Sequence, residues 1–526
     1  MWDNTHAVKK EVCRCTPMTL RACIAHEIPG GYSRVLAMYL RVHLLGAHGS
    51  LTAGVPLDLG AHGGLVVLWA KLANLVADGE GFQLSYEWKG ASSIRPCLRH
   101  YNVLSIGSGL AALDTSGQFV DLACSDPGKF RAWNHADLCA NAAGVLEAKA
   151  RREAGTMSKT MYDKVVKCAG FNTTSMGLLA DTALAHHCDW VQVITKDWMH
   201  SFLQNGILTD EAFAMIKRAG HLGCTPDALL AFLRHGSWRY PSWVPGSPAV
   251  SAEIFNPKRK PEDRLKCTAS ELLGMYGMLR CFIETEIAED PSVMEERRSF
   301  MACCDVVDLI LEAKRHGNAA TLAPQVQQAM QRFFQLHVAA YGKELLKPKH
   351  HWGFDVCEQL ARDNRVLDAF SLERLHLRSK RLANNAKNTS RFEATVLGGL
   401  IQFQLNSLQA NSLDGGLEGM HRPLAELPNT MVANRMQWFG VSAARNDVVF
   451  DGSRMGVVVT CARHAQEQPY VIVELYVHDA RVSDHCSRWR AMGCSAGAAR
   501  YATFPADRLR FPRAWKDEGD TMLVVV

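Results

Sequence analysis

The 526-residue chain has no apolar run long enough to cross a membrane, because none approaches the roughly 18–20 residues that a membrane helix requires. The longest candidate, residues 64–77, is interrupted by Lys71. The start of the chain, MWDNTHAVKK, lacks the apolar segment and the small-residue cleavage site of a signal peptide. The 17 cysteines follow no regular spacing. We therefore expect an intracellular protein with reduced thiols and no membrane partner.

The sequence also lacks several familiar catalytic signatures. It contains no Ser/His/Asp or Cys/His nucleophile pattern and no glycine loop that would cradle a phosphate. Gly107 and Gly109 form a Gly-x-Gly without the third glycine of a dinucleotide-binding loop. A formal net charge of +5 is mildly basic, which is compatible with a nucleic-acid partner but does not identify one.

Hydrophobic patterning divides the chain into segments of different character. Residues 1–63 show no clear hydrophobic periodicity. From Gly64 the pattern becomes clearer, and we expect a strand or a strand pair that ends before Asp78. A second apolar run, residues 188–195, predicts a buried strand. Helical patterns cover residues 209–346 and 347–411. Residues 433–526 form a β-rich region, with strands expected at 456–462, 469–479 and 521–526.

Single carboxylates follow both predicted apolar strands. Asp78 comes directly after the first, Asp197 comes shortly after the second, and His200 stands three residues beyond Asp197. Carboxylates at the ends of separate strands could converge on divalent cations. Each aspartate also has a structural interpretation, because Asp197 could cap a helix and Asp78 could form a turn with Gly79.

Three blocks of sequence carry a further pattern. The first block, residues 77–100, begins with Asp78 and a spacer. Lys-Gly and then Pro-Cys-x-x-His follow, and the last motif contains Cys97 and His100. The second block is the Asp-x-x-His of residues 197–200. The third, residues 347–388, opens with Lys-Pro-Lys-His-His and continues to the Glu-x-x-His formed by Glu373 and His376, after which basic residues follow.

In their order and rough spacing, these blocks resemble the DDE transposase domain of CACTA-like and Plavaka-type cut-and-paste elements, over about residues 65–390. The family has a second cysteine where this chain has His100. The resemblance implies an α/β fold with an RNase H-like core that carries a large all-helical insertion, followed here by the small β-rich C-terminal domain. The core would comprise residues 64–208 and 347–411, with the insertion at 209–346.

The resemblance further implies Mg²⁺- or Mn²⁺-dependent cleavage and transfer of DNA strands. Asp78, Asp197 and Glu373 would bind the metal, and His200 and His376 would lie three residues from their carboxylates on the same helical face. The partner would be the double-stranded DNA of transposon ends, the protein would be nuclear in a eukaryotic host, and a homo-oligomer is compatible with this function. Contacts to the DNA backbone are expected from Lys349, His350, Arg374, Arg378, Lys380 and Arg381, with Lys387 and Arg391 as further members of the basic set.

Several alternatives remain open at the level of the sequence. Glu393 competes with Glu373 as the third carboxylate. Cys97 and His100 could form half of a zinc site, which His135 and Cys139 would complete. The whole chain could also be an inactive or host-adopted transposase relic that binds DNA or protein and catalyses nothing.

Overall fold

A computed structural model of the chain describes residues 22–46, 49–60, 63–242, 252–255, 264–386, 389–410, 415–424, 427–438, 441–465, 467–493 and 499–526. Residues 1–21, 47–48 and 61–62 of the poorly defined segment 1–63, and the predicted DNA contact Lys387, lie outside these residues. Among the described residues, no helix combines the length and the apolar character that spanning a bilayer would require.

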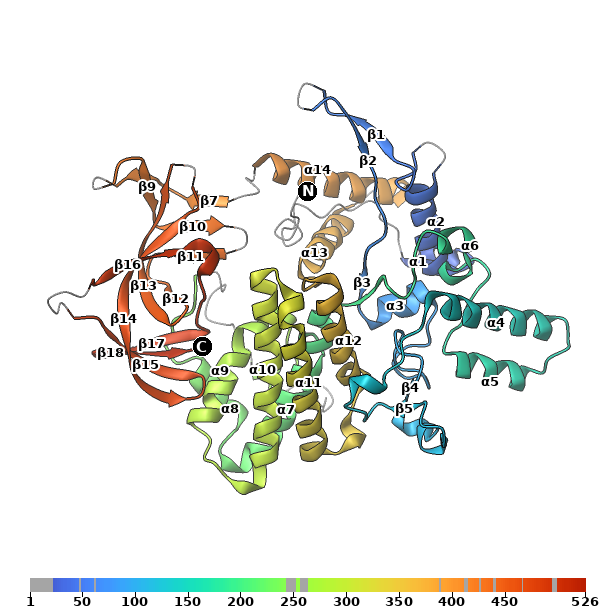
Figure 1. The fold of residues 1–526 in the computed structure, drawn as a ribbon, viewed down its shortest axis with the longest axis horizontal. Coiled ribbons are helices and arrows are strands. Elements are labelled where there is room, and N and C mark those ends of the chain that lie inside the picture. The colour runs from blue at the N-terminus through green and yellow to red at the C-terminus, as the bar shows by residue number, and fades with distance from the viewer. Residues whose placement is uncertain are drawn as a thin grey trace. The chain divides into compact units, whose positions relative to one another are not determined.

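The chain forms two compact units, each built from separated segments. Among the described residues, unit A contains those within 22–202 and 308–369, and unit B contains those within 203–307 and 370–526. The long helix α10 (Met294–His316) begins in unit B and ends in unit A. A mixed α/β fold with a helical region and a β-rich C-terminal domain is therefore confirmed (Figure 1).

Unit A combines short strands with helices drawn from both of its segments. Its helices are α1 (Ala22–Glu27), α2 (Gly31–Leu45), α3 (Gly79–Tyr86), α4 (His135–Glu153), α5 (Lys159–Ala169), α6 (Thr182–Ala185), α11 (Ala319–Tyr341) and α12 (Pro348–Asp363). Its strands are β1 (Val55–Asp58), β2 (Leu65–Leu68), β3 (Leu75–Ala77), β4 (Val103–Leu104), β5 (Val120–Asp121) and β6 (Ile194–Lys196). They pair only two by two, as β1–β2, β3–β6 and β4–β5.

The pairing of β3 with β6 is parallel, as two strands of an α/β core should be. Within the described residues, however, these strands join no larger sheet, so the RNase H-like core stays a prediction. An apolar core lies around the pair and includes Phe82, Trp190 and Trp352. Helices α11 and α12 lie side by side in Figure 1 and pack against each other.

The strand predicted at 188–195 is shorter than the apolar run in the sequence suggested. Only residues 194–196 are extended, and the preceding residues form buried turns. The reason is Asp189, whose carboxylate accepts hydrogen bonds from the backbone N–H groups of Val191 and Gln192 at 2.9 and 3.0 Å. An aspartate that binds the backbone two residues ahead favours a turn over a strand.

Unit B joins helices to an antiparallel β domain. Its helices are α7 (Ile207–Arg218), α8 (Pro226–Leu233), α9 (Ala269–Thr285), α13 (Phe370–Asn385) and α14 (Phe392–Ala410). Helix α9 begins with a capping box between Thr268 and Glu271. It packs against two strands of the β domain, β14 (Tyr470–Ser483) and β18 (Thr521–Val525).

The β domain consists of a nine-stranded sheet and a three-stranded sheet. The three-stranded sheet contains β7 (Gly415–Glu418), β10 (Arg435–Trp438) and β11 (Val441–Ala444). The larger sheet contains β14, β18, β8 (Arg422–Pro423), β9 (Thr430–Ala433), β12 (Val448–Asp451), β13 (Arg454–His464), β15 (Cys486–Ala491), β16 (Tyr501–Pro505) and β17 (Ala514–Glu518). Strands β13, β14 and β18 confirm the three strands expected from the sequence. In β14, Val471 and Val473 are fully buried while the residue between them is not, which is the two-residue alternation of a strand with one face in the core.

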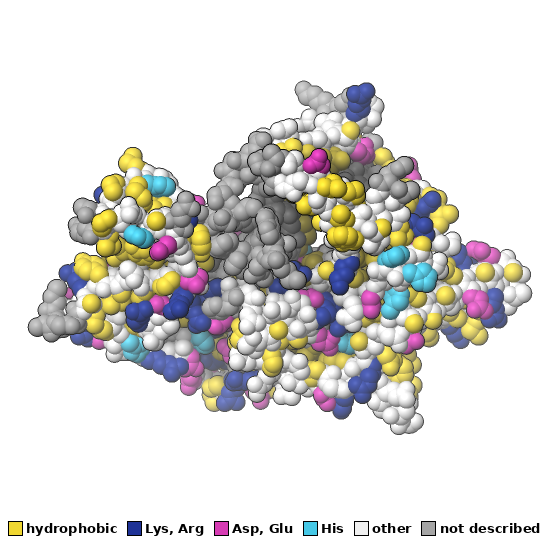
Figure 2. Space-filling model, turned by 45° about the horizontal axis from the view of Figure 1, so that its top comes forward, with side chains coloured by type: hydrophobic (Ala, Val, Ile, Leu, Met, Phe, Trp, Pro, Cys, Tyr) yellow, Lys and Arg dark blue, Asp and Glu magenta, His cyan; other side chains and the backbone are white. Residues whose placement is uncertain are grey.

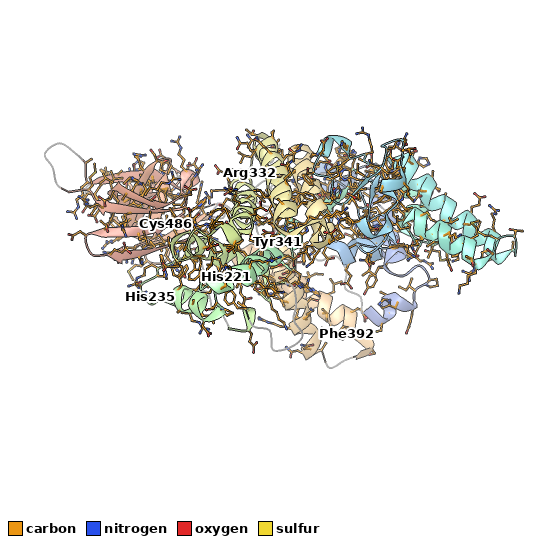
Figure 3. The ribbon with its side chains drawn as sticks, turned by 90° about the horizontal axis from the view of Figure 1, so that it is seen from below. His221, His235, Arg332, Tyr341, Phe392 and Cys486 are labelled. Atoms are coloured by element: carbon orange, nitrogen blue, oxygen red, sulfur yellow. The ribbon has the colours of Figure 1, made fainter. Side chains whose placement is uncertain are left out.

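The described cysteines are free thiols. One of them, Cys486, opens strand β15 (Figure 3).

Candidate functional site

The carboxyl ends of β3 and β6 bring two predicted catalytic residues together. Ala77 and Lys196 are register partners at the last position of the parallel pair. Asp78 and Asp197 are therefore the next residue on each strand, and the N–H of Asp197 donates to the carbonyl of Ala77 at 3.4 Å. Neighbouring strands lie about 4.8 Å apart. Asp78 and Asp197 are therefore neighbours in space although 119 positions separate them in the sequence.

Asp197 is buried, and both of its carboxylate oxygens accept hydrogen bonds. Oδ1 accepts from the backbone N–H groups of Met199 and Ala369, each at 3.1 Å. Oδ2 forms a short hydrogen bond with Nδ1 of His200, whose side chain is partly exposed. His200 therefore orients the carboxylate, and it follows Asp197 in the π-helical turn Met199–Leu203.

Asp78 is half-buried and caps helix α3. Its Oδ1 accepts a hydrogen bond from the N–H of Gly81 at 2.7 Å. This is the local role that the Asp-Gly sequence also suggested. A capping carboxylate keeps a second oxygen, so the cap and a place beside Asp197 are compatible.

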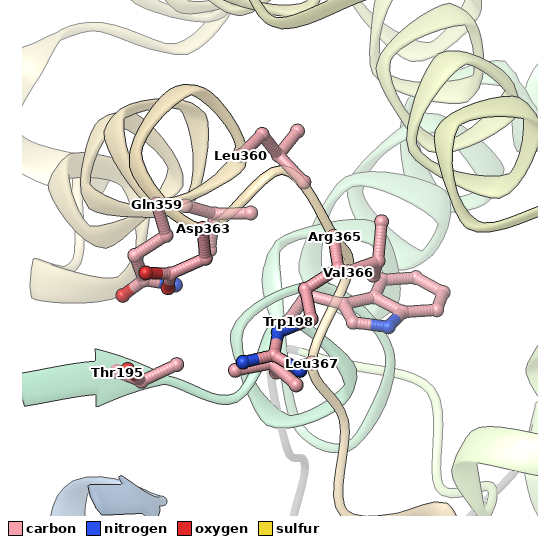
Figure 4. A pocket seen from close by; sticks show the side chains of 9 residues that line it. Thr195, Trp198, Gln359, Leu360, Asp363, Arg365, Val366 and Leu367 are labelled. Atoms are coloured by element: carbon pink, nitrogen blue, oxygen red, sulfur yellow. The ribbon is translucent and has the colours of Figure 1, made fainter. Parts of the chain in front are cut away.

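Helix α12 completes the surroundings of β6. The amide of Gln359 pairs with the backbone of Lys196, and Arg362 donates to the carbonyl of Ile194 at 3.3 Å. A small pocket with room for about one water molecule lies beside Thr195 and Trp198 (Figure 4). Gln359 and Asp363 line its other side. This pocket is too small for a substrate.

Lys196 turns the opposite way from its neighbour and is fully buried in an aromatic cage. Its Nζ lies 4.6 Å from the ring centroid of Phe82, 5.0 Å from that of Trp88 and 4.3 Å from that of Trp352. Among the described residues, this Nζ has no hydrogen-bond partner. Burial lowers the pKa of Lys196 below its usual value, although the nearby Asp355 and Cys97 act in the other direction.

A second cluster of chemically active groups lies in unit A, between the segment after α3 and helix α12. Cys97, His100, His351 and Asp355 each direct one ligand atom to a common centre, and these atoms all lie within 4.8 Å of one another. All four residues are at most 2% exposed. A buried Cys/His/His/Asp cluster of this kind could hold a metal ion.

The charges of these four residues depend strongly on one another. Burial and Asp355 act to raise the pKa of the Cys97 thiol, but His351 and His100 outweigh them and lower it to about 7. Burial opposes the protonation of His100, yet Cys97, Asp355 and Glu358 raise its pKa well above the usual value. Burial also opposes ionisation of Asp355, but the two histidines hold its pKa far below the usual range.

His135 and Cys139, suggested from the sequence as the zinc ligands that would complete Cys97 and His100, are not their partners. His135 and Cys139 contact each other at 3.7 Å across one turn of α4, and Nδ1 of His135 accepts from the N–H of Trp190. Neither belongs to the cluster. The sequence did not suggest His351 and Asp355 as metal ligands. They stand four apart on one helix, and this i, i+4 spacing was the available signal.

The predicted DNA contacts fall in different environments. Nζ of Lys349 donates to the carbonyl of His200 at 2.6 Å, so it lies beside the turn that follows Asp197. His350 is buried, its ring centroid lies 4.4 Å from that of His337 in a tilted arrangement, and burial lowers its pKa well below the usual value. A buried neutral imidazole does not bind a phosphate, so His350 is corrected to a core residue. Near it, Tyr341 on α11 contacts the same His337 (Figure 3).

The remaining predicted residues belong to helix α13 of unit B. Glu373 stands in its first turn and is half-buried. His376, Arg374, Lys380 and Arg381 are exposed, while Arg378 lies over the ring of Phe403 at 3.3 Å from the centroid. Glu393 stands in the first turn of α14, and Arg391 precedes that helix.

Comparisons of the chain with protein-family models, with curated proteins and with solved structures find no match.

Proposed function

We propose that the chain is a transposase-like protein that cleaves and transfers DNA strands with the help of a divalent cation. The observation that carries this proposal is the position of Asp78 and Asp197 at the carboxyl ends of adjacent parallel strands. One or two carboxylates, with waters and the phosphate itself, can hold Mg²⁺ for phosphoryl transfer, so two carboxylates at one sheet edge suit such a site.

The other proposed roles at the cation site are assigned from contacts and positions near Asp197. His200 orients Asp197, and Lys349 holds the backbone of His200. Glu373 is the proposed third carboxylate, because it stands only four residues beyond Ala369, whose N–H binds Asp197. Glu393 is a further 20 residues along the chain.

The divalent cation would neutralise the phosphodiester and stabilise the leaving oxygen. Its proposed ligands are oxygen atoms, whereas the Cys97 cluster offers a thiol and two imidazoles. Since Mg²⁺ prefers hard oxygen ligands, the two sites are chemically distinct.

DNA binding in this proposal depends on a local basic set. Exposed Arg374, Lys380 and Arg381 lie on α13, the helix that carries Glu373. On the face shown in Figure 2, basic and acidic side chains are interspersed rather than separated by sign. Short basic segments, rather than a broad basic surface on that face, would therefore neutralise the phosphates.

One observation favours a second function. Because Asp197 is buried and three of its acceptor positions are used by Met199, Ala369 and His200, a cation there would have to bind the remaining lone pair of Oδ2 or displace one of these contacts. A chain in which those contacts persist would be a transposase relic that binds DNA or protein without catalysis.

A nicking assay on supercoiled plasmid distinguishes the two functions. With Mn²⁺ or Mg²⁺, the full chain should nick the DNA, and Asp197→Asn or Asp78→Asn should lower the rate at least about a hundredfold, equivalent to roughly 2.7 kcal/mol of activation free energy. Glu80→Gln is the matched control, since Glu80 is an exposed acid two residues from Asp78. Absence of nicking with both cations, by a chain that is folded by circular dichroism, would overturn the catalytic proposal.

A further inference from the structure

The four buried residues Cys97, His100, His351 and Asp355 have the separations of a tetrahedral metal site. With Zn–S of about 2.3 Å and Zn–N or Zn–O of about 2.0–2.1 Å, tetrahedral geometry separates sulfur from nitrogen or oxygen by about 3.5 Å and the lighter atoms by about 3.3 Å. Sγ of Cys97 lies 3.6 Å from Nδ1 of His100 and 3.7 Å from Oδ1 of Asp355. Nε2 of His351 lies 4.0 Å from the same oxygen, the widest of these separations. Nδ1 of His100 lies 3.1 Å from Nε2 of His351 and 3.0 Å from Oδ1 of Asp355.

The outer hydrogen bonds of His100 suit metal binding. Its Nε2 lies 3.1 Å from a carboxylate oxygen of Glu358, which in turn binds Nε of Arg99 at 2.7 Å. A hydrogen bond from Nε2–H to a carboxylate leaves the Nδ1 lone pair free to bind a cation. The N–H of His100 also donates to the sulfur of Cys97 at 3.3 Å, which stabilises a thiolate.

Each of the four converging atoms can donate an electron pair to a metal ion. A thiolate and a carboxylate buried together carry two negative charges, and a buried charge without compensation is strongly unfavourable. Nδ1 of His100 and Nε2 of His351 lie 3.1 Å apart, so the lone pairs of both nitrogens can be directed at one shared cation. A divalent cation at the centre would satisfy all four groups.

We propose that Cys97, His100, His351 and Asp355 bind one structural zinc ion. Zinc fits because it accepts thiolate, imidazole and carboxylate in one tetrahedral site, whereas Mg²⁺ and Ca²⁺ require oxygen ligands. Four protein ligands leave no coordination position for substrate, and the burial of all four excludes solvent. The ion therefore stabilises the fold and has no catalytic role.

The zinc would join the two separated segments of unit A. Cys97 and His100 come from the segment that follows α3, while His351 and Asp355 come from α12, some 250 residues later. Helix α12 also holds the backbone of Lys196 through Gln359. Zinc would thus fix the helix that supports the strand end at Asp197, and this role holds whether or not the chain cleaves DNA.

Metal analysis of the purified full chain tests the proposal. We expect about one zinc per chain in the wild type and in Cys357→Ser, and less than about a tenth of that in Cys97→Ala and Asp355→Asn. Cys357 is the matched control, because it is a buried cysteine of α12 whose thiol donates to the carbonyl of Gly353 outside the cluster. Equal zinc in all four proteins would overturn the assignment.

Cobalt substitution keeps the test decisive if the cluster variants fail to fold. Wild-type chain exchanged into Co²⁺ should show the intense thiolate-to-cobalt absorption and the visible bands of a tetrahedral site, and Cys357→Ser should show the same spectrum. A wild-type chain that takes up no cobalt, or that has the same Tm with and without chelator, would overturn the proposal. The nicking assay plays no part in these outcomes, so the two proposals fail separately.

Discussion

The side-chain amide of Gln359 forms two hydrogen bonds with the backbone of Lys196. The N–H of Lys196 donates to Oε1 at 2.5 Å, and Nε2 donates to the carbonyl of Lys196 at 2.9 Å. On its other side, β6 pairs with β3. Gln359 therefore binds the backbone N–H and carbonyl of Lys196, the groups that a further strand beside β6 would otherwise bind.

Replacing Gln359 by leucine should loosen the strand end next to Asp197. The change keeps the volume but leaves a buried N–H and a buried carbonyl without partners, at a cost of about 1–3 kcal/mol each. Amide hydrogen exchange at Lys196 should accelerate by at least about tenfold. Gln331→Leu, which removes one bond of 3.3 Å on the neighbouring helix α11, is the control and should leave that amide protected. Unchanged exchange in Gln359→Leu would show that this pairing does not stabilise β6.

The sequence predicted the elements that depend on local pattern. Apolar runs predicted β13, β14 and β18. Asp78 and Asp197 were placed at strand ends by the same means, because an apolar run that meets a carboxylate marks the boundary of a strand. The turn at 189–192 was missed, because its cause is one side chain acting on its own backbone.

Long-range partners could not be predicted from the sequence in this way. Many histidines and cysteines could have completed the pair Cys97–His100, and the choice of His135 and Cys139 followed spacing alone. The actual partners were fixed by the docking of α12, which depends on packing over some 250 residues of separation. The aromatic cage of Lys196 has the same origin, since its rings come from α3, from the following segment and from α12.

Glu358 should tune the affinity of the proposed zinc site. Glu358→Gln keeps the size of the side chain but replaces the carboxylate that binds Nε2 of His100. Loss of such an outer contact lowers metal affinity by about 10–100-fold. Competition with a chromophoric chelator should measure this drop, while the stoichiometry at saturation stays one zinc per chain. Glu153→Gln, an exposed change at the end of α4, should leave the affinity unaltered, and an equal affinity in Glu358→Gln would remove Glu358 from the site.

Lys196→Met should be tolerated at neutral pH. Methionine has a similar length and fills the aromatic cage, so we expect a change in unfolding free energy below about 1.5 kcal/mol. Lys196→Ala, by contrast, leaves a cavity and should cost about 2–5 kcal/mol. Chemical denaturation of the two variants gives the comparison, and a large loss in Lys196→Met would mean that attraction between the ammonium group and the rings exceeds the cost of its burial.

The pH dependence of the wild type supplies an independent test of the buried lysine. Because the folded-state pKa of Lys196 is lowered, the unfolded chain binds the extra proton at any pH between that pKa and the usual value of about 10.4. Stability of the wild type should therefore rise with pH across this window relative to Lys196→Met. Tm values of both proteins at pH 8, 9 and 10 would show the two curves converging or crossing, and parallel curves would contradict a lowered pKa.

Within unit B, Glu284 of α9 should stabilise the β domain only while it is ionised. Its carboxylate binds Nδ1 of His485 at 2.6 Å and the hydroxyl of Ser483 at 2.5 Å. Burial acts to raise the pKa of Glu284, but these contacts outweigh it and lower the pKa below the usual value. A lowered carboxyl pKa adds stability that is complete above about pH 4.3 and is lost as the pH falls through the folded-state pKa.

Glu284→Gln should accordingly lower the unfolding free energy by about 1.5–3 kcal/mol at pH 7, and by progressively less as the pH falls toward 3. Urea unfolding across this range, followed by the fluorescence of the β-domain tryptophans, measures the difference. Glu289→Gln is the control: the Glu289 side chain is 77% exposed and its nearest ion-pair partner, Arg297, is 4.0 Å away, so its replacement should change stability by less than about 0.5 kcal/mol at any pH. A constant penalty for Glu284→Gln from pH 7 to pH 3 would assign its effect to packing instead of charge, because a protonated glutamate is nearly isosteric with glutamine.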